Sequence, residues 1–378
     1  MRTITCIEDL RLKARRNVPR AFFDYVEAGS YAEETLRANR ADLEAIKLRQ
    51  RVMVDVSSRD TSTTILGQKV SLPLALGPVG MTGMQWGIGE IHAARAALAA
   101  GIPYTLSTVA ICSIEDVARG TEAPFWFQLY VMKDRGFVQA LIERATAARC
   151  SALMLTVDLP LLGQRHCDLK NGLAVPPSLK LRNLVSMAMR PRWCARIFRG
   201  RRWSFGNLEG YVNGRSGAVS LSHWVNGQFD ATLNWKDVEW VRSLWRGPLI
   251  IKGILDPEDA KSAVQSGASA LVVSNHGGRQ LDGAPSSISM LPKIRDAVAG
   301  DAEVYFDGGI RSGQDMLRAL ALGAKACLIG RAYAYGLGAE GQAGVAKAIE
   351  ILKRELDVSM ALTGCRTLAD IGPQILAG

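Results

Sequence analysis

The chain has 378 residues, 48% of them hydrophobic, and a mean hydropathy of +0.06, a composition that indicates a folded domain rather than a disordered chain. Its seven cysteines form no C-x-x-C pair and its N-terminus carries no apolar leader, so we expect no disulfide framework, no metal site and no export from the cytoplasm. The formal net charge of +10 is concentrated between Leu169 and Leu208, a segment that contains no Asp or Glu.

Eight short apolar runs recur along the chain, and most are hydrophobic throughout, which is typical of parallel strands buried on both faces. The expected strands are residues 73–77, 104–107, 126–130, 152–157, 249–252, 270–274, 304–307 and 326–330. Stretches of helical period lie between them, at residues 90–100, 134–148, 257–266, 290–298 and 313–322. Eight βα units in a chain of this length predict an α/β fold, the TIM (β/α)8 barrel.

The first expected strand begins near Pro73, so residues 1–72 form an N-terminal helical extension that we expect to cap one end of the barrel. After the fourth strand, the gap from Asp158 to Pro248 far exceeds the roughly two to six residues of an ordinary βα loop. We therefore expect a single domain over residues 1–378, with the barrel at about 73–340 and a long basic insertion at about 170–230.

Polar residues and glycines collect where the expected strands end, which is the side of a TIM barrel that carries the active site. In chain order they are Gly80, Ser107, Gln128, Tyr130, Thr156, Asp158, Lys252, Ser274, His276, Asp307, Gly330 and Arg331. Any one of them could be a buried polar residue with a structural partner. Together they predict a functional site, because a random scatter would not select strand ends so often.

The most specific local pattern follows the sixth strand and reads S-N-H-G-G-R-Q-L-D, from Ser274 to Asp282. His276 and Arg279 lie three residues apart on a glycine-containing turn, so both can face the same small volume. Imidazole, with an ordinary pKa of ~6.5, suits proton abstraction near neutrality, and a guanidinium group binds a carboxylate through two parallel hydrogen bonds. The pattern predicts a base beside a carboxylate clamp, as a 2-hydroxy-acid site requires; the alternative is a structural loop with a half-buried histidine.

A second pattern predicts a phosphate site after the seventh and eighth strands, where TIM barrels commonly bind phosphate. Glycines let backbone N–H groups approach the phosphate, and two arginines supply charge. The residues are Asp307, Gly308, Gly309, Arg311, Gly330 and Arg331. The G-x-G-x-x-G string at residues 336–341 does not directly follow a strand, so we interpret it as a surface turn and infer no NAD site.

These strings resemble the FMN-dependent α-hydroxy-acid oxidase and dehydrogenase family, over almost the whole chain. The likeness begins with A-F-F-D-Y at residues 21–25 and ends with D-G-G-I-R at residues 307–311. Between them it includes F-Q-L-Y at 127–130, L-T-V-D at 155–158 and K-G at 252–253. The string S-N-H-G-G-R-Q-L-D is highly specific to the family. Residues 235–240 and 252–260 are most similar to the membrane-associated bacterial L-lactate dehydrogenases of this family, which also includes mandelate dehydrogenase.

The resemblance implies FMN as the cofactor and assigns roles to the strand-end residues. His276 would be the base and Asp158 would pair with its imidazole, while Tyr130 would bind the substrate hydroxyl group. The substrate-binding residues would be Tyr25, Tyr130, Arg165 and Arg279. The cofactor-binding residues would be Pro78, Val79, Gly80, Ser107, Gln128, Thr156, Lys252, Ser274, Asp307, Gly308, Gly309, Arg311, Gly330 and Arg331. Lys252 would lie beside the flavin N1 and O2 atoms, where negative charge develops on reduction.

The activity implied by the resemblance is oxidation of a small L-2-hydroxy acid, with L-lactate to pyruvate first and L-mandelate second. Val109 stands where glycolate oxidase carries tryptophan, which disfavours glycolate. Gly80 stands where several oxidases of the family carry alanine, which favours transfer of electrons to a quinone or cytochrome and leaves an oxygen-using oxidase as an alternative. A non-redox flavin-binding isomerase is a more distant alternative, disfavoured by His276 with Arg279.

The segment from Lys180 to Arg202 interleaves cations with apolar residues, a pattern that can lie on an anionic bilayer. We therefore expect peripheral attachment at the cytoplasmic side of the inner membrane; a solvated loop is the alternative. A nucleic-acid partner is disfavoured because few aromatic residues are interleaved. We also expect a homo-oligomer, whereas the exact hydroxy acid and the electron acceptor stay open.

Overall fold

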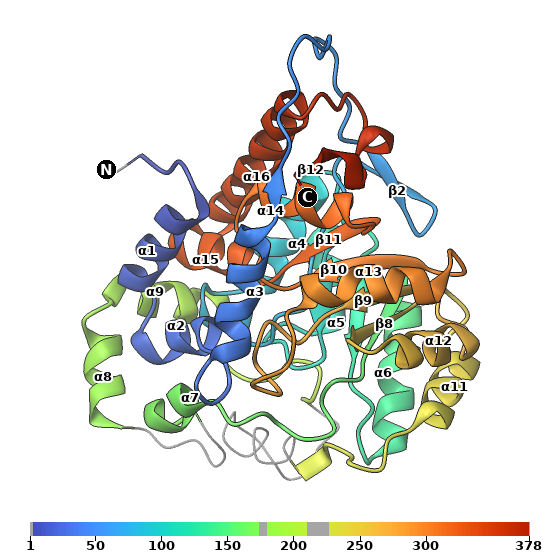
Figure 1. The fold of residues 1–378 in the computed structure, drawn as a ribbon. Helices are drawn as coiled ribbons and strands as arrows, with labels where there is room; N and C mark the ends of the chain where they lie inside the picture. Colours follow the sequence, from blue (N-terminus) through green and yellow to red (C-terminus); the bar gives the residue numbers. More distant parts are fainter. Residues whose placement is uncertain (1–2, 174–179, 210–226, 378) are drawn as a thin grey trace.

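The computed structural model describes residues 3–173, 180–209 and 227–377, and eight parallel strands form its centre (Figure 1). Their order is β4-β11-β10-β9-β8-β7-β6-β5, and a parallel bridge between Leu76 and Tyr104 joins the first strand to the last. The strands are β4 (Leu74–Leu76), β5 (Thr105–Ser107), β6 (Trp126–Leu129), β7 (Ala152–Thr156), β8 (Leu249–Ile254), β9 (Ala270–Val273), β10 (Glu303–Asp307) and β11 (Ala326–Ile329). The predicted TIM barrel is confirmed.

Helices surround the strands, as the helical periods predicted. They are α4 (Gly89–Ala99), α5 (Ile114–Thr121), α6 (Arg135–Ala147), α11 (Trp235–Leu244), α12 (Pro257–Gln265), α13 (Ser287–Val298), α14 (Gly313–Ala321), α15 (Arg331–Glu340) and α16 (Gln342–Leu362). The local sequence determines where several of these helices begin. At α14, for example, Ser312 and Asp315 form a capping box at the N-terminus of the helix. Helix α13 begins before the predicted residue 290 because the Ser286 hydroxyl caps it, accepting from the Ser289 N–H at 3.3 Å.

Side-chain alternation along the strands explains how the sequence fills the barrel. One buried cluster contains Trp126, Met154, Ile250, Val272 and Tyr305, one from each of β6 to β10, with the rings of Trp126 and Tyr305 stacked at 6.3 Å. Because successive side chains on a strand point to opposite faces, the residue two positions further on points to the same face. Those residues are Gln128, Thr156, Lys252, Ser274 and Asp307. The polar strand ends therefore face the barrel axis directly above an apolar core.

The N-terminal extension holds the predicted helices, α1 (Ile7–Asn17), α2 (Arg20–Glu27) and α3 (Glu34–Ala45), and also a hairpin that the sequence analysis missed. The hairpin pairs β2 (Thr63–Ile65) with β3 (Gln68–Val70), and Ile65 and Val70 pack against the inner barrel cluster. The Leu66 N–H donates to Glu303 at the start of β10, at 3.1 Å. The hairpin therefore covers the N-terminal end of the barrel, whereas α2 lies at the opposite end.

Shorter elements complete the chain. Strand β1 (Lys47–Leu48) pairs with β12 (Leu376–Ala377), so the C-terminal strand lies beside the segment that follows α3. Three single 3-10 turns are η1 (Thr82–Met84), η2 (Leu368–Asp370) and η3 (Pro373–Ile375).

After β7 the chain forms α7 (His166–Asn171), and the basic insertion then contains α8 (Leu181–Ala188) and α9 (Pro191–Gly200), which Figure 1 shows on the α2 side of the molecule. Trp193 anchors α9: its ring stacks on Phe22 at 5.4 Å and its indole N–H donates to the Met84 carbonyl at 2.9 Å. Among the described residues, no helix combines the length and apolar character needed to cross a membrane.

One interpretation of the sequence is wrong. The glycines at residues 336–341 do not form a surface turn, because Gly336 and Gly338 lie buried inside α15. A Cβ on Gly336 would stand 2.3 Å from the Gly344 carbonyl oxygen of α16. Glycine is needed there because the two helix backbones pack in direct contact, which a turn motif does not reveal.

Candidate active site

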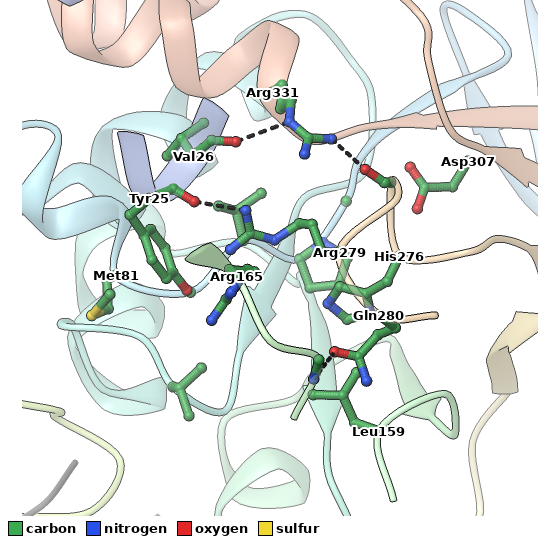
Figure 2. Close-up of a pocket in the computed structure, with 18 of the residues that line it drawn as sticks. Tyr25, Val26, Met81, Leu159, Arg165, His276, Arg279, Gln280, Asp307 and Arg331 are labelled. Atoms are coloured by element: carbon green, nitrogen blue, oxygen red, sulfur yellow. Dashed lines mark hydrogen bonds between the residues drawn. The ribbon is translucent and has the colours of Figure 1, made fainter. Parts of the chain in front are cut away.

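A cavity of about 500 Å³ opens at the C-terminal ends of the barrel strands. Most of the predicted site residues line it, and Figure 2 shows several of them facing one another. The predicted residues in its wall are Tyr25, Pro78, Val79, Gly80, Tyr130, Arg165, Lys252, His276, Arg279, Asp307, Gly308, Gly309, Arg311, Gly330 and Arg331. The other predicted residues, Ser107, Gln128, Thr156, Asp158 and Ser274, are buried or half-buried beside these, as described below.

His276 is held against Asp158 by an unusual turn. Its Nδ1 atom lies 2.9 Å from Asp158 Oδ1 and 3.1 Å from Oδ2. The backbone of His276 has φ 58°, a left-handed conformation that non-glycine residues seldom adopt. Ser274 Oγ accepts from the His276 N–H at 3.1 Å and Asn275 Oδ1 accepts from the Gly278 N–H at 3.0 Å, so side chains of the same motif hold the turn.

The environment of this pair favours a neutral imidazole. Burial lowers the pKa of His276 and outweighs Asp158, which raises it, while Lys252 and Arg279 lower it further. Burial raises the pKa of Asp158, but His276 and Lys252 outweigh this effect and the pKa is lowered overall. With Nδ1–H donating to the Asp158 carboxylate, the Nε2 atom of His276 keeps a free lone pair. This arrangement can accept a proton near neutral pH.

Two arginines and a tyrosine lie together beside the histidine (Figure 2). The guanidinium carbons of Arg279 and Arg165 lie 5.0 Å and 5.3 Å from the centre of the Tyr25 ring. Arg279 Nη1 donates to the Tyr25 carbonyl at 2.6 Å and to the Ala28 carbonyl at 2.9 Å, and Arg165 Nε pairs with Asp168 Oδ2 at 2.8 Å. Burial lowers the pKa of Arg279, with Arg165 the next cause. Two cations in one cavity can bind a carboxylate.

Lys252 is almost completely buried, with an exposed fraction of 4%, and lies in a polar network on the inner face of the barrel. Its Nζ donates to Ser274 Oγ at 3.0 Å and lies 3.2 Å from Asp307 Oδ2. Ser274 Oγ in turn donates to Asp307 Oδ2 at 2.8 Å. The ammonium group is thus fixed at the cavity wall by an adjacent carboxylate, which offsets the cost of burying a cation.

Two buried polar atoms near Lys252 have no partner among the described residues: Gln128 Nε2 and Thr156 Oγ1. Gln128 Oε1 is engaged, accepting from Ser107 Oγ at 3.1 Å, and Thr156 is opposite Lys252 in the β7–β8 register. Buried polar atoms almost always have a hydrogen-bond partner, so these two are suited to the polar edge of a bound ligand.

The phosphate pattern follows β10 and β11, the strands next to β9, so it lies beside the histidine motif. Gly308 and Gly309 have φ of 134° and 88°, values that favour glycine, and α15 begins at Arg331, with its N-terminal N–H groups available to an anion. The Arg331 guanidinium is engaged elsewhere: it donates to the carbonyls of Val26 at 2.9 Å and Gly277 at 2.8 Å. Arg331 therefore ties the end of α2 to the histidine turn.

Several cavity residues were missed by the sequence analysis. Phe205 and Phe229 come from the insertion, far along the chain from any strand end, and the Phe229 ring meets the Tyr130 ring edge-on at 5.7 Å. Asp168 could have been found, because it lies three residues after Arg165, at helical spacing. Gln280, inside the histidine motif, donates to the Asp158 carbonyl at 2.9 Å and so fixes the loop after β7.

Known proteins resemble this chain over its full length. Residues 14–378 match a protein family described as FMN-dependent dehydrogenase. An L-lactate dehydrogenase of Haemophilus influenzae is 50% identical over 374 residues, covering 99% of this chain and 98% of that protein. One of Caulobacter vibrioides is 48% identical over 375 residues, with the same 99% and 98% coverage. A crystal structure of the monotopic membrane protein (S)-mandelate dehydrogenase has a TM-score of 0.95 and 35% identity and covers 100% of both chains.

Proposed function

The chain belongs to the FMN-dependent dehydrogenase family, and on that premise we propose that it oxidises L-lactate to pyruvate. The observation that carries the proposal is the position of His276, which pairs with Asp158 and lines one cavity together with Arg165 and Arg279. A base beside a carboxylate clamp is what a 2-hydroxy acid requires. The relatives that are 48% to 50% identical are L-lactate dehydrogenases, which supports L-lactate as the substrate.

The residues of the cavity fit FMN. When bound, FMN accepts the two electrons that substrate oxidation releases. Gln128 and Thr156, with their unpartnered buried atoms, would bind the polar edge of the ring system, and Lys252 would stabilise negative charge there. Gly308, Gly309, Arg311 and the N-terminus of α15 would hold the phosphate. The remaining predicted cofactor residues would form the strand-end walls around the ring and ribityl chain.

The substrate would lie between the arginines and the histidine. Arg279 and Arg165 would bind its carboxylate with Tyr25, and Tyr130 would donate to its hydroxyl oxygen. His276 would take one substrate proton at Nε2, and the Asp158 carboxylate would stabilise the resulting imidazolium group. Nδ1 of His276 is already committed to Asp158, so the imidazole needs no reorientation before the proton moves.

The substrate is tested by anaerobic reduction of the purified yellow protein with L-lactate, L-mandelate and glycolate in turn, following the flavin absorbance. We expect L-lactate to give the highest rate at limiting concentration. L-Mandelate is the second candidate because the solved structures that resemble this chain include a mandelate dehydrogenase at 35% identity and a mandelate oxidase at 37% identity. Faster reduction by L-mandelate would overturn the L-lactate assignment, and no reduction by any of the three would overturn the reaction class.

We further propose that helices α8 and α9 attach the protein to the cytoplasmic side of an anionic inner membrane, where a quinone or a cytochrome accepts the electrons. Leu181, Met189 and Phe198 have exposed fractions of 76%, 75% and 71%, so these helices present apolar side chains to the surroundings. The neighbour of 35% identity is a monotopic membrane protein, which supports this attachment. Faster reoxidation of the reduced protein by a quinone analogue than by oxygen would support the acceptor class, and the reverse would refute it.

We also infer a homo-oligomer. The segment after β1 exposes Val52 at 71% and Met53 at 100%, and neighbouring α16 exposes Val358 at 47% and Leu362 at 55%. The Arg51 N–H donates to the Leu362 carbonyl at 3.0 Å, so these apolar groups lie on adjoining surfaces that a second copy can cover. Light scattering in detergent, with the mass of bound detergent subtracted, should give a protein mass that is a multiple of 40.9 kDa, the mass of one chain, and a protein mass of one chain would refute the oligomer.

A further inference from the structure

Glu90 is a fully buried carboxyl group that lies outside the residues lining the cavity. It stands in the first turn of α4 with an exposed fraction of 0%. Its Oε1 atom accepts from the backbone N–H of Gly83 at 2.8 Å and from that of Ile111 at 3.1 Å. Burial of a carboxyl group is costly unless it is bound by hydrogen bonds, so a carboxyl group kept here requires a specific reason.

The two N–H groups belong to different strand-end loops. Gly83 lies in η1, after β4, and Ile111 lies in the loop after β5. A Cβ on Gly83 would stand 2.6 Å from the Ile111 Cβ, so the loops are in direct contact at this point. One carboxyl oxygen therefore joins two loops that the sequence separates by a complete βα unit.

The same loops form one wall of the active-site cavity just before they reach Glu90. Gly80 and Val109 both line the cavity, and the Met81 N–H donates to the Val109 carbonyl at 3.1 Å. A Cβ on Gly80 would stand 2.8 Å from Val109 Cγ2 and 3.1 Å from the Tyr25 hydroxyl oxygen. A small separation of the two loops would thus change the space beside Tyr25.

We propose that Glu90 is a positioning residue for hydroxy-acid oxidation: by accepting from both loops, it sets the spacing between Gly80 and Val109 opposite Tyr25. The inference rests on the proposed function, because that function places substrate and flavin against this wall. Loss of the acceptor leaves two buried N–H groups unpaired, and the loops then separate to reach other partners. Misplacement of reacting groups by about 1 Å can lower a rate by ~10²-fold.

The test compares Glu90→Gln with Glu90→Met, two side chains of similar length. The Gln side chain retains an oxygen that can accept from both N–H groups, whereas Met fills the space without an acceptor. We expect the Met variant, at equal bound FMN and saturating substrate, to reduce its flavin on the order of 10-fold more slowly or worse, and the Gln variant to restore the rate. Hydrogen exchange at the Gly83 and Ile111 amides should accelerate in the Met variant alone, with or without FMN.

Wild-type rates per flavin and unchanged exchange in the Met variant would overturn the inference, and so would a Gln variant as slow as the Met variant. If the Met variant does not fold, Glu90→Asp gives the same measurement, because its shorter side chain cannot reach both N–H groups. Rates are compared for whichever hydroxy acid reduces the wild-type flavin. Failure of wild type with L-lactate therefore refutes the proposed substrate, while a Met variant equal to wild type refutes the role of Glu90.

Discussion

The barrel mouth, where the C-terminal ends of the strands meet the cavity, and the basic insertion differ in whether their charged side chains are paired within the chain. At the mouth, Lys252 lies 3.2 Å from Asp307 Oδ2, and the Asp158 carboxylate accepts from His276 Nδ1 at 2.9 Å. In the insertion, Arg192, Arg199 and Arg201 are exposed and have no ion pair among the described residues, and large apolar side chains beside them are exposed as well. These three charged side chains at the mouth are therefore paired within the chain, whereas the three exposed arginines of the insertion are available to a partner outside it.

The number of cations in the insertion is larger than the number available to a partner. Two cations of the insertion are not available to a partner: Arg196 stacks on the Trp86 ring at 3.7 Å, and Arg202 forms ion pairs with Asp116 at 2.7 Å and Glu209 at 3.0 Å. These two residues fix α9 and the following segment to the barrel. Net charge along the sequence thus overstates the surface charge, because some cations serve packing.

The largest expected effect is at the mouth. The His276→Ala variant should retain FMN, since other loops hold the cofactor, but lose about 10²- to 10⁴-fold in turnover because the proton acceptor is gone. Flavin content by absorbance and steady-state turnover with L-lactate provide the measurement. Partial rescue by added imidazole would strengthen the assignment, and retention of more than about half of the wild-type kcat would contradict it.

The next largest effect concerns the exposed arginines of the insertion and tests whether they bind a membrane. Replacing Arg192, Arg199 and Arg201 together with Gln should weaken binding to anionic liposomes by roughly 10²-fold, since each cation near such a surface contributes about 1 kcal/mol. Co-sedimentation measures the binding, which in wild type should decrease at high salt. Flavin reduction by substrate should persist in the variant, because these side chains do not line the cavity.

A control variant separates this local effect from net charge. Lys325, Lys353 and Arg354 are exposed and lie outside the insertion. Changing all three to Gln removes the same three charges and should leave liposome binding close to wild type. Equal weakening in both triple variants, or wild type that stays in the supernatant at low salt, would remove the membrane role and favour a soluble acceptor.

Arg279→Lys should have a smaller effect than loss of the base. A point charge replaces a planar fork, and the three N–H groups of an ammonium cannot supply two hydrogen bonds to the carboxylate as well as the two to the Tyr25 and Ala28 carbonyls. We expect kcat/KM to fall roughly 10- to 100-fold, with KM raised and kcat lowered. Unchanged values of both constants would show that Arg279 does not contact the substrate.

The smallest effect is a shift in pH dependence. His276 must be neutral to accept a proton, so kcat/KM should fall as pH decreases through its pKa, and burial places that pKa below the usual ~6.5. Asp158 favours the protonated imidazole, so Asp158→Asn should lower the pKa further and move the acid limb to lower pH while reducing kcat. An acid limb that moves to higher pH would contradict the pairing.

The strands and the central residues of the site could be predicted because both depend on patterns within short segments of the sequence. Apolar runs such as 270–273 predict buried strands, and the alternation of side chains then places Ser274, Lys252 and Asp307 on one inner face. The S-N-H-G-G-R motif contains the proposed base, the proposed carboxylate clamp and the glycines of the turn within a few residues. All eight strands follow from such patterns, and the glycine pattern after the last two strands indicated a phosphorylated cofactor, whereas FMN was implied by the family resemblance and is supported by the family match.

What only the tertiary structure decided lies in contacts between distant segments. Phe205 and Phe229 enter the cavity from the insertion, which contains none of the predicted strands. Glu90 joins two loops through backbone N–H groups that carry no sequence signal, and Gly336 lies in a helix–helix contact although its motif resembles a turn. The sequence shows that Arg196 and Arg202 carry charge, but it does not show that they contact Trp86 and Asp116. Periodicity and motifs indicate how a segment forms its own backbone hydrogen bonds and which of its faces points to the core. The roles of the residues above depend instead on partners from distant segments, which come into contact only when the chain folds.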